Sequence, residues 1–248
     1  NIKDISKLKK KLNSIKPEII FHLAAQPLVI DSYKKPLETF NVNINGTLNL
    51  LECIRNISSV KSIVIITTDK VYKINKKNNI YSESNELGGF DPYSASKVGS
   101  EIVANSYIKS FFQNSNLKNK VATARAGNVI GGGDFSKNRL LPDIIHSIKH
   151  KKKLIVRNPN HVRPWQHVLD PIVGYLILAE KQYKKKINTN EHSWNFGPNK
   201  KNFSKVIDII KFIKKLEHFN YIFLKTKKFK ETEILKLNSN KAKKKLNW

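Results

Sequence analysis

Two side chains four positions apart offer the clearest chemistry in this sequence. Tyr93 and Lys97 lie in the segment YSASK, and residues four apart share one side of a helix, so both can point into one cleft. A phenol has a pKa of about 10 in water, and an adjacent ammonium group stabilises the phenolate. The pair therefore has the composition of a general base, although Y-x-x-x-K by itself also occurs by chance.

A second group of polar residues stands upstream, at the end of an apolar run. The run SIVII predicts a strand that is buried on both faces of a parallel sheet. Ligands of open α/β sheets bind at the carboxyl ends of such strands. We therefore expect the tyrosine and lysine to share one site with the four residues that follow the run, which are Thr67, Thr68, Asp69 and Lys70.

The elements that must position these residues alternate between strand and helix. Strands are predicted at 19–25, 62–67 and 121–126, and helices at 38–55 and 93–112. This alternation predicts an α/β fold with a doubly wound parallel sheet of the Rossmann type. Within the second helix, we expect one side to be formed by Ala95, Val98, Ile102 and Phe111.

The character of the chain changes after Gly127, where the glycine-rich segment GNVIGGGDF begins a series of shorter elements. We expect Asp170 to cap a helix that has Pro171 at its first position, and Ser204 to cap a last amphipathic helix. The remaining predicted elements are a helix at 140–149, an extended segment at 154–157 and a strand at 194–196. The division that follows is a nucleotide-binding domain of residues 1–127 and 168–193, and a smaller, interleaved substrate-binding domain of residues 128–167 and 194–248.

One feature of dinucleotide-binding sheets is missing from the sequence. Such sheets begin with a strand and a glycine-rich turn, where a helix N-terminus holds the pyrophosphate. No G-x-G-x-x-G segment is present, the glycines at 131–133 come too late in the order of elements, and the chain contains no methionine. We therefore expect an N-terminally truncated chain that lacks the first strand of the sheet and the helix after it. We also expect this chain by itself to be inactive.

Composition narrows the function classes. The net charge of +27 comes from scattered lysine runs without aromatic residues between them, which favours a compositional bias over nucleic-acid binding. No apolar run approaches the roughly 18 residues that a membrane helix needs, so we expect a cytoplasmic protein without a membrane partner. Cys53 is the single cysteine and should be a buried free thiol, and no Cys or His cluster has metal-ligand spacing.

Six segments in fixed order carry a family resemblance. The chain resembles the extended short-chain dehydrogenase/reductase superfamily, and within it the CDP-glucose 4,6-dehydratases. The segments are HLAAQP at 22–27, NINGTLNLLE at 43–52, TTDK at 67–70, YSASK at 93–97, AGNVIGGGD at 126–134 and RPWQHVLDP at 163–171. The resemblance implies NAD as cofactor, CDP-glucose as nucleotide-sugar substrate, and a homo-oligomer, either a dimer or a tetramer.

The resemblance also implies roles for the catalytic residues. Tyr93 would remove the proton of the sugar C4 hydroxyl, Lys97 would hold the phenolate and the nicotinamide ribose, and Thr68 would hydrogen-bond the same hydroxyl. Asp69 would be the acid for the C6 hydroxyl that leaves as water. Lys70 stands where a base for the C5 proton is needed, a role that a lysine fills only where burial or nearby positive charge removes its proton.

Binding residues follow from the same resemblance. Cofactor contacts are implied for the tyrosine and lysine and for Ala24, Ala25, Gln26 and Thr67. The nucleotide diphosphate would be held by Asn128, Arg139, Leu140 and Arg163, and guanidinium groups suit phosphate oxygens because they donate two hydrogen bonds in parallel. His22 and His167 are expected to be hydrogen-bonded structural residues.

Two other functions stay open. A nucleotide-sugar 4-epimerase or another enzyme of the superfamily would share the tyrosine and lysine, but it has no use for an acid at C6, so Asp69 and Lys70 favour dehydration. An inactive basic protein that binds nucleic acid would predict salt-sensitive DNA binding and no retained cofactor.

Overall fold

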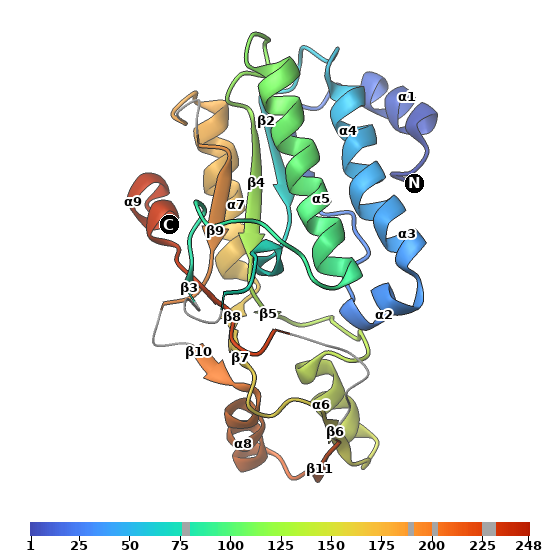
Figure 1. Ribbon diagram of the computed structural model, residues 1–248, viewed down its shortest axis with the longest axis vertical. Coiled ribbons are helices and arrows are strands. Elements are labelled where there is room, and N and C mark those ends of the chain that lie inside the picture. The colour runs from blue at the N-terminus through green and yellow to red at the C-terminus, as the bar shows by residue number, and fades with distance from the viewer. Residues whose placement is uncertain (76–79, 188–190, 200–202, 225–231) are drawn as a thin grey trace.

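Two lobes make up the molecule (Figure 1). The computed structural model describes residues 1–75, 80–187, 191–199, 203–224 and 232–248. The larger lobe contains the main sheet and its covering helices, and the smaller lobe lies at the carboxyl ends of the main strands.

The main sheet has four parallel strands in the order β1-β2-β4-β9. Its strands are β1 (Ile19–His22), β2 (Ser62–Ile66), β4 (Val121–Ala126) and β9 (Ser193–Phe196). Because successive side chains of a strand point to opposite faces, Ile63 and Ile65 of β2 join the core on one face and Val64 joins the core on the other. The predicted α/β class with a parallel sheet is confirmed.

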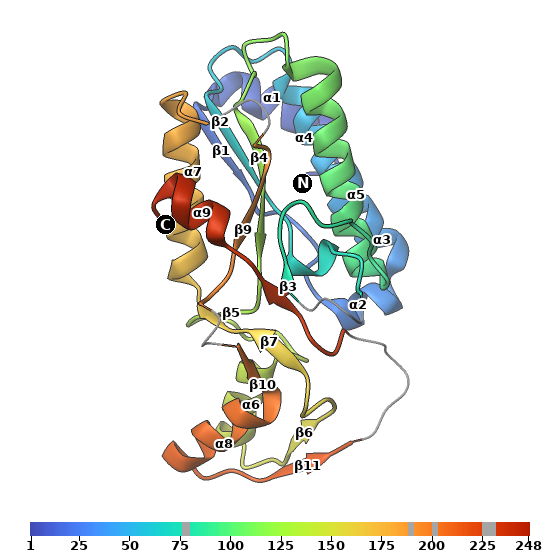
Figure 2. The same cartoon turned by 60° about the vertical axis from the view of Figure 1, so that its left-hand side comes forward.

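Helices cover both faces of this sheet (Figure 2). On one face lie α4 (Gly46–Ile54) and α5 (Pro92–Tyr107), and on the other lies α7 (Leu169–Tyr183), with α9 (Asn240–Leu246) beside it. The large lobe also contains α1 (Ile5–Ile15), α2 (Val29–Lys34) and α3 (Pro36–Phe40). The two predicted long helices are present, each with one π-helical turn, at Asn41–Asn45 (η1) and Ile108–Phe112 (η3).

A capping box sets the start of α5. The Asp91 side chain accepts from the Ser94 N–H at 3.0 Å, the Ser94 hydroxyl accepts from the Asp91 N–H at 3.0 Å, and Pro92 occupies the first turn. These contacts satisfy amide groups that a helix start leaves unpaired. They also fix the position of Tyr93 in the first turn of the helix.

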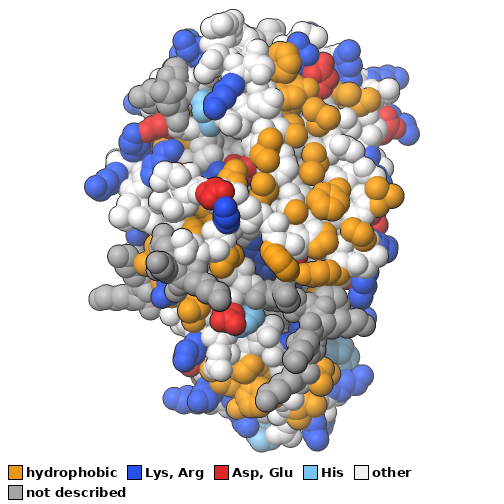
Figure 3. Space-filling view, viewed as in Figure 1, with side chains coloured by type: hydrophobic (Ala, Val, Ile, Leu, Met, Phe, Trp, Pro, Cys, Tyr) orange, Lys and Arg blue, Asp and Glu red, His pale blue; other side chains and the backbone are white. Residues whose placement is uncertain are grey.

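The apolar side predicted for the helix at 93–112 is an outer side at two of its four residues. Ile102 of α5 is 58% exposed and Phe111 of η3 is 44% exposed, and apolar side chains gather on the surface over α4 and α5 (Figure 3). The inner side of α5 is polar instead, with buried Ser96, Lys97, Ser100 and Glu101. Periodicity of apolar residues assumes that the buried side is apolar, and here the buried side carries hydrogen-bonding groups.

The smaller lobe has its own core. Ile144, Leu154, Val156, Ile210 and Phe219 are buried together. The elements around them are α6 (Leu140–Lys149), β6 (Leu154–Val156), β7 (Val162–Pro164), β10 (Phe203–Lys205), α8 (Val206–Leu216) and β11 (Tyr221–Phe223). Short strand pairs complete the fold: β5 (Val129–Ile130) with β8 (Gln166–His167), and β3 (Ile80–Tyr81) with β12 (Lys236–Leu237).

The predicted boundary of the second domain needs correction. Residues 194–248 were assigned to the substrate-binding domain, but β9 is a strand of the main sheet and α9 packs against α7 and β9. These two segments therefore belong to the larger lobe. The chain returns to the main sheet for β9, builds α8 and β11 in the smaller lobe, and returns again for α9.

Two predicted helix caps were also wrong. Val168 is the N-cap of α7, so Asp170 lies inside the first turn, because the chain passes from β8 into the helix almost directly. Ser204 lies in β10, and Lys205 is the N-cap of α8, where its N–H donates to the Asp208 carboxylate at 3.1 Å.

Substitution of Gly174 tests the packing of α7 on the sheet. A Cβ at this position would lie 2.4 Å from two ring carbons of Phe196 in β9, so one of the two elements must move. We expect Gly174→Ala to lower the free energy of unfolding by about 1–3 kcal/mol in urea, despite the better helix propensity of alanine. Gly132→Ala is the matched control, because its Cβ would meet open space, and an equal loss in both variants would contradict the packing argument.

Candidate active site

A cleft of about 480 Å³ lies between the two lobes, at the carboxyl ends of β2 and β4. Both lobes contribute predicted site residues to its walls. From the larger lobe and the crossing segment come Thr67, Thr68, Asp69, Lys70, Tyr93 and Asn128, and from the smaller lobe come Arg139, Leu140 and Arg163.

Four predicted site residues do not line this cleft. Ala24 and Ala25 follow β1, and Ala24 is exposed. The Gln26 side chain donates to the Thr39 hydroxyl at 2.8 Å, and its N–H donates to Asn43 Oδ1 at 2.8 Å. The amide of Gln26 therefore holds the loop after β1, and its side chain is already engaged within the protein. Lys97 is buried beneath the end of β2.

Tyr93 is buried in the first turn of α5, where its N–H donates to the Ser32 hydroxyl at 3.1 Å. Burial raises the pKa of its phenol to about 12, and the negative charge of Asp69 also raises it. A hydrogen bond with Thr68 and the positive charge of Arg139 lower this pKa. In this arrangement Tyr93 is a neutral phenol at physiological pH.

Lys97 lies one turn further along α5. Its Nζ donates to the backbone oxygen of Ile66 at 3.0 Å. The sequence suggested that this ammonium group would contact the Tyr93 oxygen directly, whereas the hydrogen bond observed is the one to Ile66. Burial lowers the pKa of Lys97 to about 8, and the negative charge of Glu101 opposes that change. The side chain therefore remains mostly charged at pH 7.

His22 lies close to this lysine, at the end of β1. Burial, and then the charge of Lys97, lower the pKa of its imidazole to about 4. The ring is therefore neutral at pH 7, and its Nε2 lies 3.1 Å from the Thr47 hydroxyl. The predicted structural role of His22 agrees with these contacts. His167 is exposed, and its Nδ1 accepts from the Leu169 N–H at 3.3 Å.

Asp69 is the most perturbed carboxyl group that lines the cleft. It is 2% exposed, and burial raises its pKa to about 6, against the lowering effects of the Lys70 charge, a hydrogen bond from Thr68 and the Arg163 charge. The Thr68 hydroxyl donates to Oδ1 at 3.1 Å, whereas Oδ2 has no hydrogen-bond partner among the described residues. The group is thus a carboxylic acid that can hold its proton close to neutral pH and has one buried oxygen without a hydrogen-bond partner among the described residues.

The wall contributed by the smaller lobe is basic. Arg139 donates to Asp134 at 3.1 Å, and Arg157, which the sequence reasoning missed, donates to Asn138 at 2.9 Å. Arg163 is buried, and its NH1 donates to the backbone oxygens of Val162 at 3.0 Å and Glu233 at 3.2 Å. These contacts hold guanidinium groups in place, which suits a phosphate-bearing ligand.

Two buried charged residues near the site were also missed. Glu101 and Arg125 form an ion pair at 2.8 Å with both side chains 3% exposed. The sequence did contain a signal, because Glu101 follows Lys97 by four positions on the same helix. Within the parts of the chain that the structure describes, no group of three or more His, Cys, Asp or Glu residues could hold a metal ion, and no helix is long and apolar enough to span a membrane.

The pKa of Asp69 gives a test that does not need a substrate. A carboxyl group whose folded pKa lies above its unfolded value of 3.8 stabilises the fold fully below that value, and this contribution is lost as pH rises through about 6. The difference corresponds to about 3 kcal/mol at most. We therefore expect Asp69→Asn to gain stability relative to the natural sequence between pH 4 and pH 7, measured by urea unfolding.

Asp134→Asn is the control with the opposite sign. Burial raises the pKa of Asp134, but the hydrogen bonds from Ser136 and the charge and hydrogen bond of Arg139 together outweigh burial, so the pKa is lowered. Its carboxylate contributes stability above the unfolded pKa, so this variant should lose stability relative to the natural sequence as pH rises from about 3 to about 5. Parallel pH profiles for the two variants would refute the assignment of Asp69 as the buried acid.

Comparisons with known proteins identify relatives of this chain. The family model described as GDP-mannose 4,6 dehydratase matches residues 1–248. A CDP-glucose 4,6-dehydratase of Salmonella typhimurium is 40% identical over 253 residues, which cover 100% of this chain and 70% of that protein. A dTDP-D-glucose 4,6-dehydratase of Dictyostelium discoideum is 31% identical over 192 residues, which cover 73% of this chain and 42% of that protein.

Solved structures show the same fold at lower identity. A dTDP-glucose 4,6-dehydratase from Bacillus anthracis, in complex with NAD, superposes with a TM-score of 0.82 at 21% identity, covering 100% of this chain and 72% of that one. A UDP-glucuronic acid 4-epimerase from Bacillus cereus gives a TM-score of 0.84 at 24% identity, covering 99% and 74%. Because dehydratases and epimerases superpose equally well, the fold alone does not separate the two reactions.

Proposed function

This chain belongs to the GDP-mannose 4,6-dehydratase family of the extended short-chain dehydrogenases/reductases, and from that premise we propose that it is a nucleotide-sugar 4,6-dehydratase that converts CDP-D-glucose to CDP-4-dehydro-6-deoxy-D-glucose and water. One observation favours dehydration over epimerisation. Asp69, a buried carboxylic acid with one oxygen that has no hydrogen-bond partner among the described residues, lines the cleft together with Thr68 and Tyr93. An epimerase needs no acid at that place.

The cofactor we propose is NAD, which supplies the hydride acceptor at C4 and the hydride donor at C6 when it is bound. The carboxyl ends of β1 and β2 can accommodate this cofactor. Ala24 and Ala25, which follow β1, have only methyl side chains and therefore leave room for it. The ammonium of Lys97 adds a positive charge beneath the end of β2. We propose contacts to the cofactor from these residues and from the backbone at Thr67.

We propose that the phenolate of Tyr93 takes the proton of the C4 hydroxyl as the first step, after the phenol has lost its own proton to water, while the hydride of C4 would go to the acceptor that NAD supplies when bound. Thr68, whose hydrogen bond lowers the pKa of the phenol, is proposed to hydrogen-bond the same hydroxyl. The C4 ketone that forms makes the C5 proton acidic, and Lys70 lies beside Asp69 at the wall of the cleft, where its neutral amine, formed by prior loss of a proton to water, would accept that proton. Asp69 then gives its own proton to the C6 hydroxyl, which leaves as water.

The smaller lobe is proposed to bind the nucleotide diphosphate. Arg139 and Arg163 face the cleft from α6 and β7, and their charges act on Tyr93 and Asp69 respectively. A diphosphate held by this wall places the attached sugar towards the catalytic residues of the larger lobe. Asn128 and Leu140 line the same part of the cleft, so we propose that they contact the nucleotide.

Turnover tests the proposal. The natural gene product that contains these residues is incubated with CDP-D-glucose and NAD⁺, alkali is added, and the absorbance of 4-keto-6-deoxy sugars is followed. We expect Tyr93→Phe and Asp69→Asn each to reduce the rate by about 10²–10⁴-fold, because each removes one proton-transfer group. Asp4→Asn, at the N-cap of α1 and outside the cleft, should keep the rate within a few-fold.

The outcomes separate the alternatives. Product from a dTDP, GDP or UDP sugar but not from CDP-glucose would keep the reaction and reject the nucleotide. Interconversion of C4 epimers without a 4-keto-6-deoxy product would establish the epimerase instead. Salt-sensitive DNA binding without any sugar turnover would favour the basic binding protein.

We also propose a homo-oligomer formed through the outer surface of α4 and α5. Its exposed apolar residues are Leu48, Ile102 and Phe111, and Figure 3 shows apolar side chains gathered over this part of the larger lobe. A contiguous apolar surface of this kind favours association with a partner. Ile102→Lys should convert the oligomer to a monomer in sedimentation experiments, whereas Phe212→Lys, in exposed α8 of the smaller lobe, should not.

A further inference from the structure

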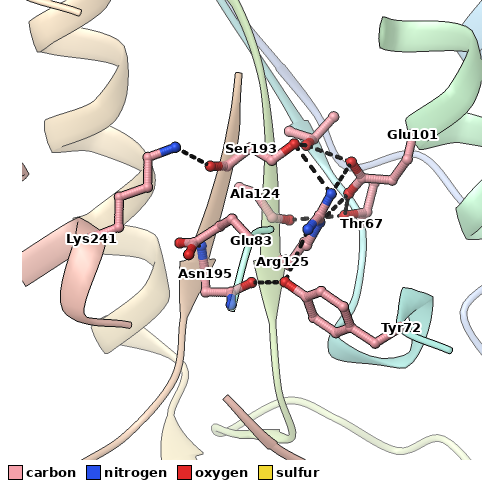
Figure 4. Close-up of polar contacts among 10 residues, drawn as sticks. Thr67, Tyr72, Glu83, Glu101, Ala124, Arg125, Ser193, Asn195 and Lys241 are labelled. Atoms are coloured by element: carbon pink, nitrogen blue, oxygen red, sulfur yellow. Dashed lines mark hydrogen bonds and ion pairs between the residues drawn. The ribbon is translucent and has the colours of Figure 1, made fainter. Parts of the chain in front are cut away.

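A group of buried polar side chains lies between α5 and the strands β2, β4 and β9 of the main sheet (Figure 4). Its centre is the Glu101–Arg125 pair, in which Arg125 donates from Nε to Oε1 at 2.9 Å and from NH2 to Oε2 at 2.8 Å. Neither residue lines the cleft. Burial of two charges is unfavourable unless every remaining hydrogen-bonding position is filled, so this pair needs a reason to be there.

The carboxylate of Glu101 has two further donors. The Thr67 hydroxyl donates to Oε1 at 2.6 Å, and the Thr123 hydroxyl donates to Oε2 at 2.7 Å. Each carboxylate oxygen thus accepts one bond from the arginine and one from a threonine. Thr67 is the first residue after β2, and Thr123 lies in β4, so one carboxylate of α5 joins both strands.

The other side of Arg125 is held by residues that do not line the cleft. Its NH1 donates to the Tyr72 hydroxyl at 2.9 Å, and that hydroxyl donates to Asn195 Oδ1 in β9 at 2.6 Å. Its NH2 also donates to the Ser193 hydroxyl at 3.2 Å. The Tyr72 hydroxyl therefore supports the arginine on the side away from Glu101.

Two residues of α5, one turn apart, hold two consecutive residues at the end of β2. Lys97 donates to the oxygen of Ile66 at 3.0 Å, and Glu101 accepts from Thr67 at 2.6 Å. A spacing of four residues places these side chains along one side of the helix, and Tyr93 lies one turn before Lys97 on the same side. The catalytic strand end is thus fixed against the catalytic helix at two successive points.

We propose that Glu101 is a positioning residue, whose carboxylate, neutralised from behind by Arg125, locks the end of β2 onto α5 and keeps the ammonium group of Lys97 charged. The catalytic consequence rests on the proposed function. The structural part does not, because the contacts belong to the protein alone.

The charges around Lys97 favour this assignment. Tyr93 and Glu101 lie on its own helix, the neutral His22 lies at the end of β1, Asp69 lies on η2 (Asp69–Val71) beyond the strand end, and Arg125 reaches from β4 behind Glu101. Burial lowers the pKa of Lys97 to about 8, and Glu101 is the group that raises it. Without that negative charge the lysine would lose its proton nearer to neutral pH.

Direct titration of Lys97 tests this in the natural gene product without a substrate. The ¹³Cε resonance is followed against pH in protein labelled at lysine, and it is assigned by its absence in Lys97→Met. Glu101→Gln keeps an acceptor for Thr67 but removes the charge, so the pKa of Lys97 should fall by about one unit. Tyr72→Phe, which weakens the network on its remote side, should leave that pKa unchanged.

Turnover supplies the second readout. Because Lys97 acts in its charged form, activity is lost as pH rises through its pKa, and the alkaline limb of kcat should move to lower pH by the same amount in Glu101→Gln. KM should change little, since Glu101 does not line the cleft. The alkaline limb of Tyr72→Phe should coincide with that of the natural sequence.

A titration of Lys97 that is the same in Glu101→Gln and the natural sequence would overturn the proposal. If Glu101→Gln does not fold, because it leaves Arg125 buried without its partner, the double variant Glu101→Gln/Arg125→Gln removes both charges. The pKa of Lys97 must then still fall, by less than in the single variant, because the more distant positive charge is also removed. A shifted titration in a protein that turns over no nucleotide sugar would retain the positioning role and reject the proposed function.

Discussion

The docking of α5 across the carboxyl end of β2 is the contact on which the site depends. Strand β2 supplies Thr68 and Asp69 at its end, and α5 supplies Tyr93, so neither element has a site alone. The capping box at Asp91 sets where the helix starts, and the parallel pairing of β2 with β1 and β4 sets where the strand ends. A shift of either element by one residue would separate the phenol from the threonine.

Burial at this junction perturbs several titratable groups through the same physical cause. Removal from water raises the pKa of Asp69 to about 6 and of Tyr93 to about 12, and lowers that of Lys97 to about 8 and of His22 to about 4. In every case the neutral form is favoured. Glu101 is the exception, because the charge and hydrogen bonds of Arg125 and the threonine hydroxyls hold its pKa below the usual value against the effect of burial.

Much of the fold was predictable because local and tertiary preferences agree. The apolar runs before Thr67 and Gly127 became central strands, and the helix that carries the tyrosine and lysine begins where the proline and aspartate before it indicate. The inner face of α5 could not be predicted from apolar periodicity, since its partners are polar groups supplied by residues such as Asn43, 53 positions upstream of Ser96. Glu101 was overlooked for the same reason, because its partner Arg125 lies on a different strand.

The path of the chain between the lobes explains why the cleft forms where it does. After β4 the chain leaves the sheet through Gly127, where a Cβ would lie 2.4 Å from Cγ of Pro164 at the end of β7. At this point the backbone of Gly127 in the larger lobe therefore contacts the side chain of Pro164 in the smaller lobe. Strand β5, which follows Gly127, pairs with β8. Asn128 and Arg163 flank this close contact, and both line the cleft. The basic wall thus faces the catalytic strand end because a residue without a side chain lets the smaller lobe pack this close.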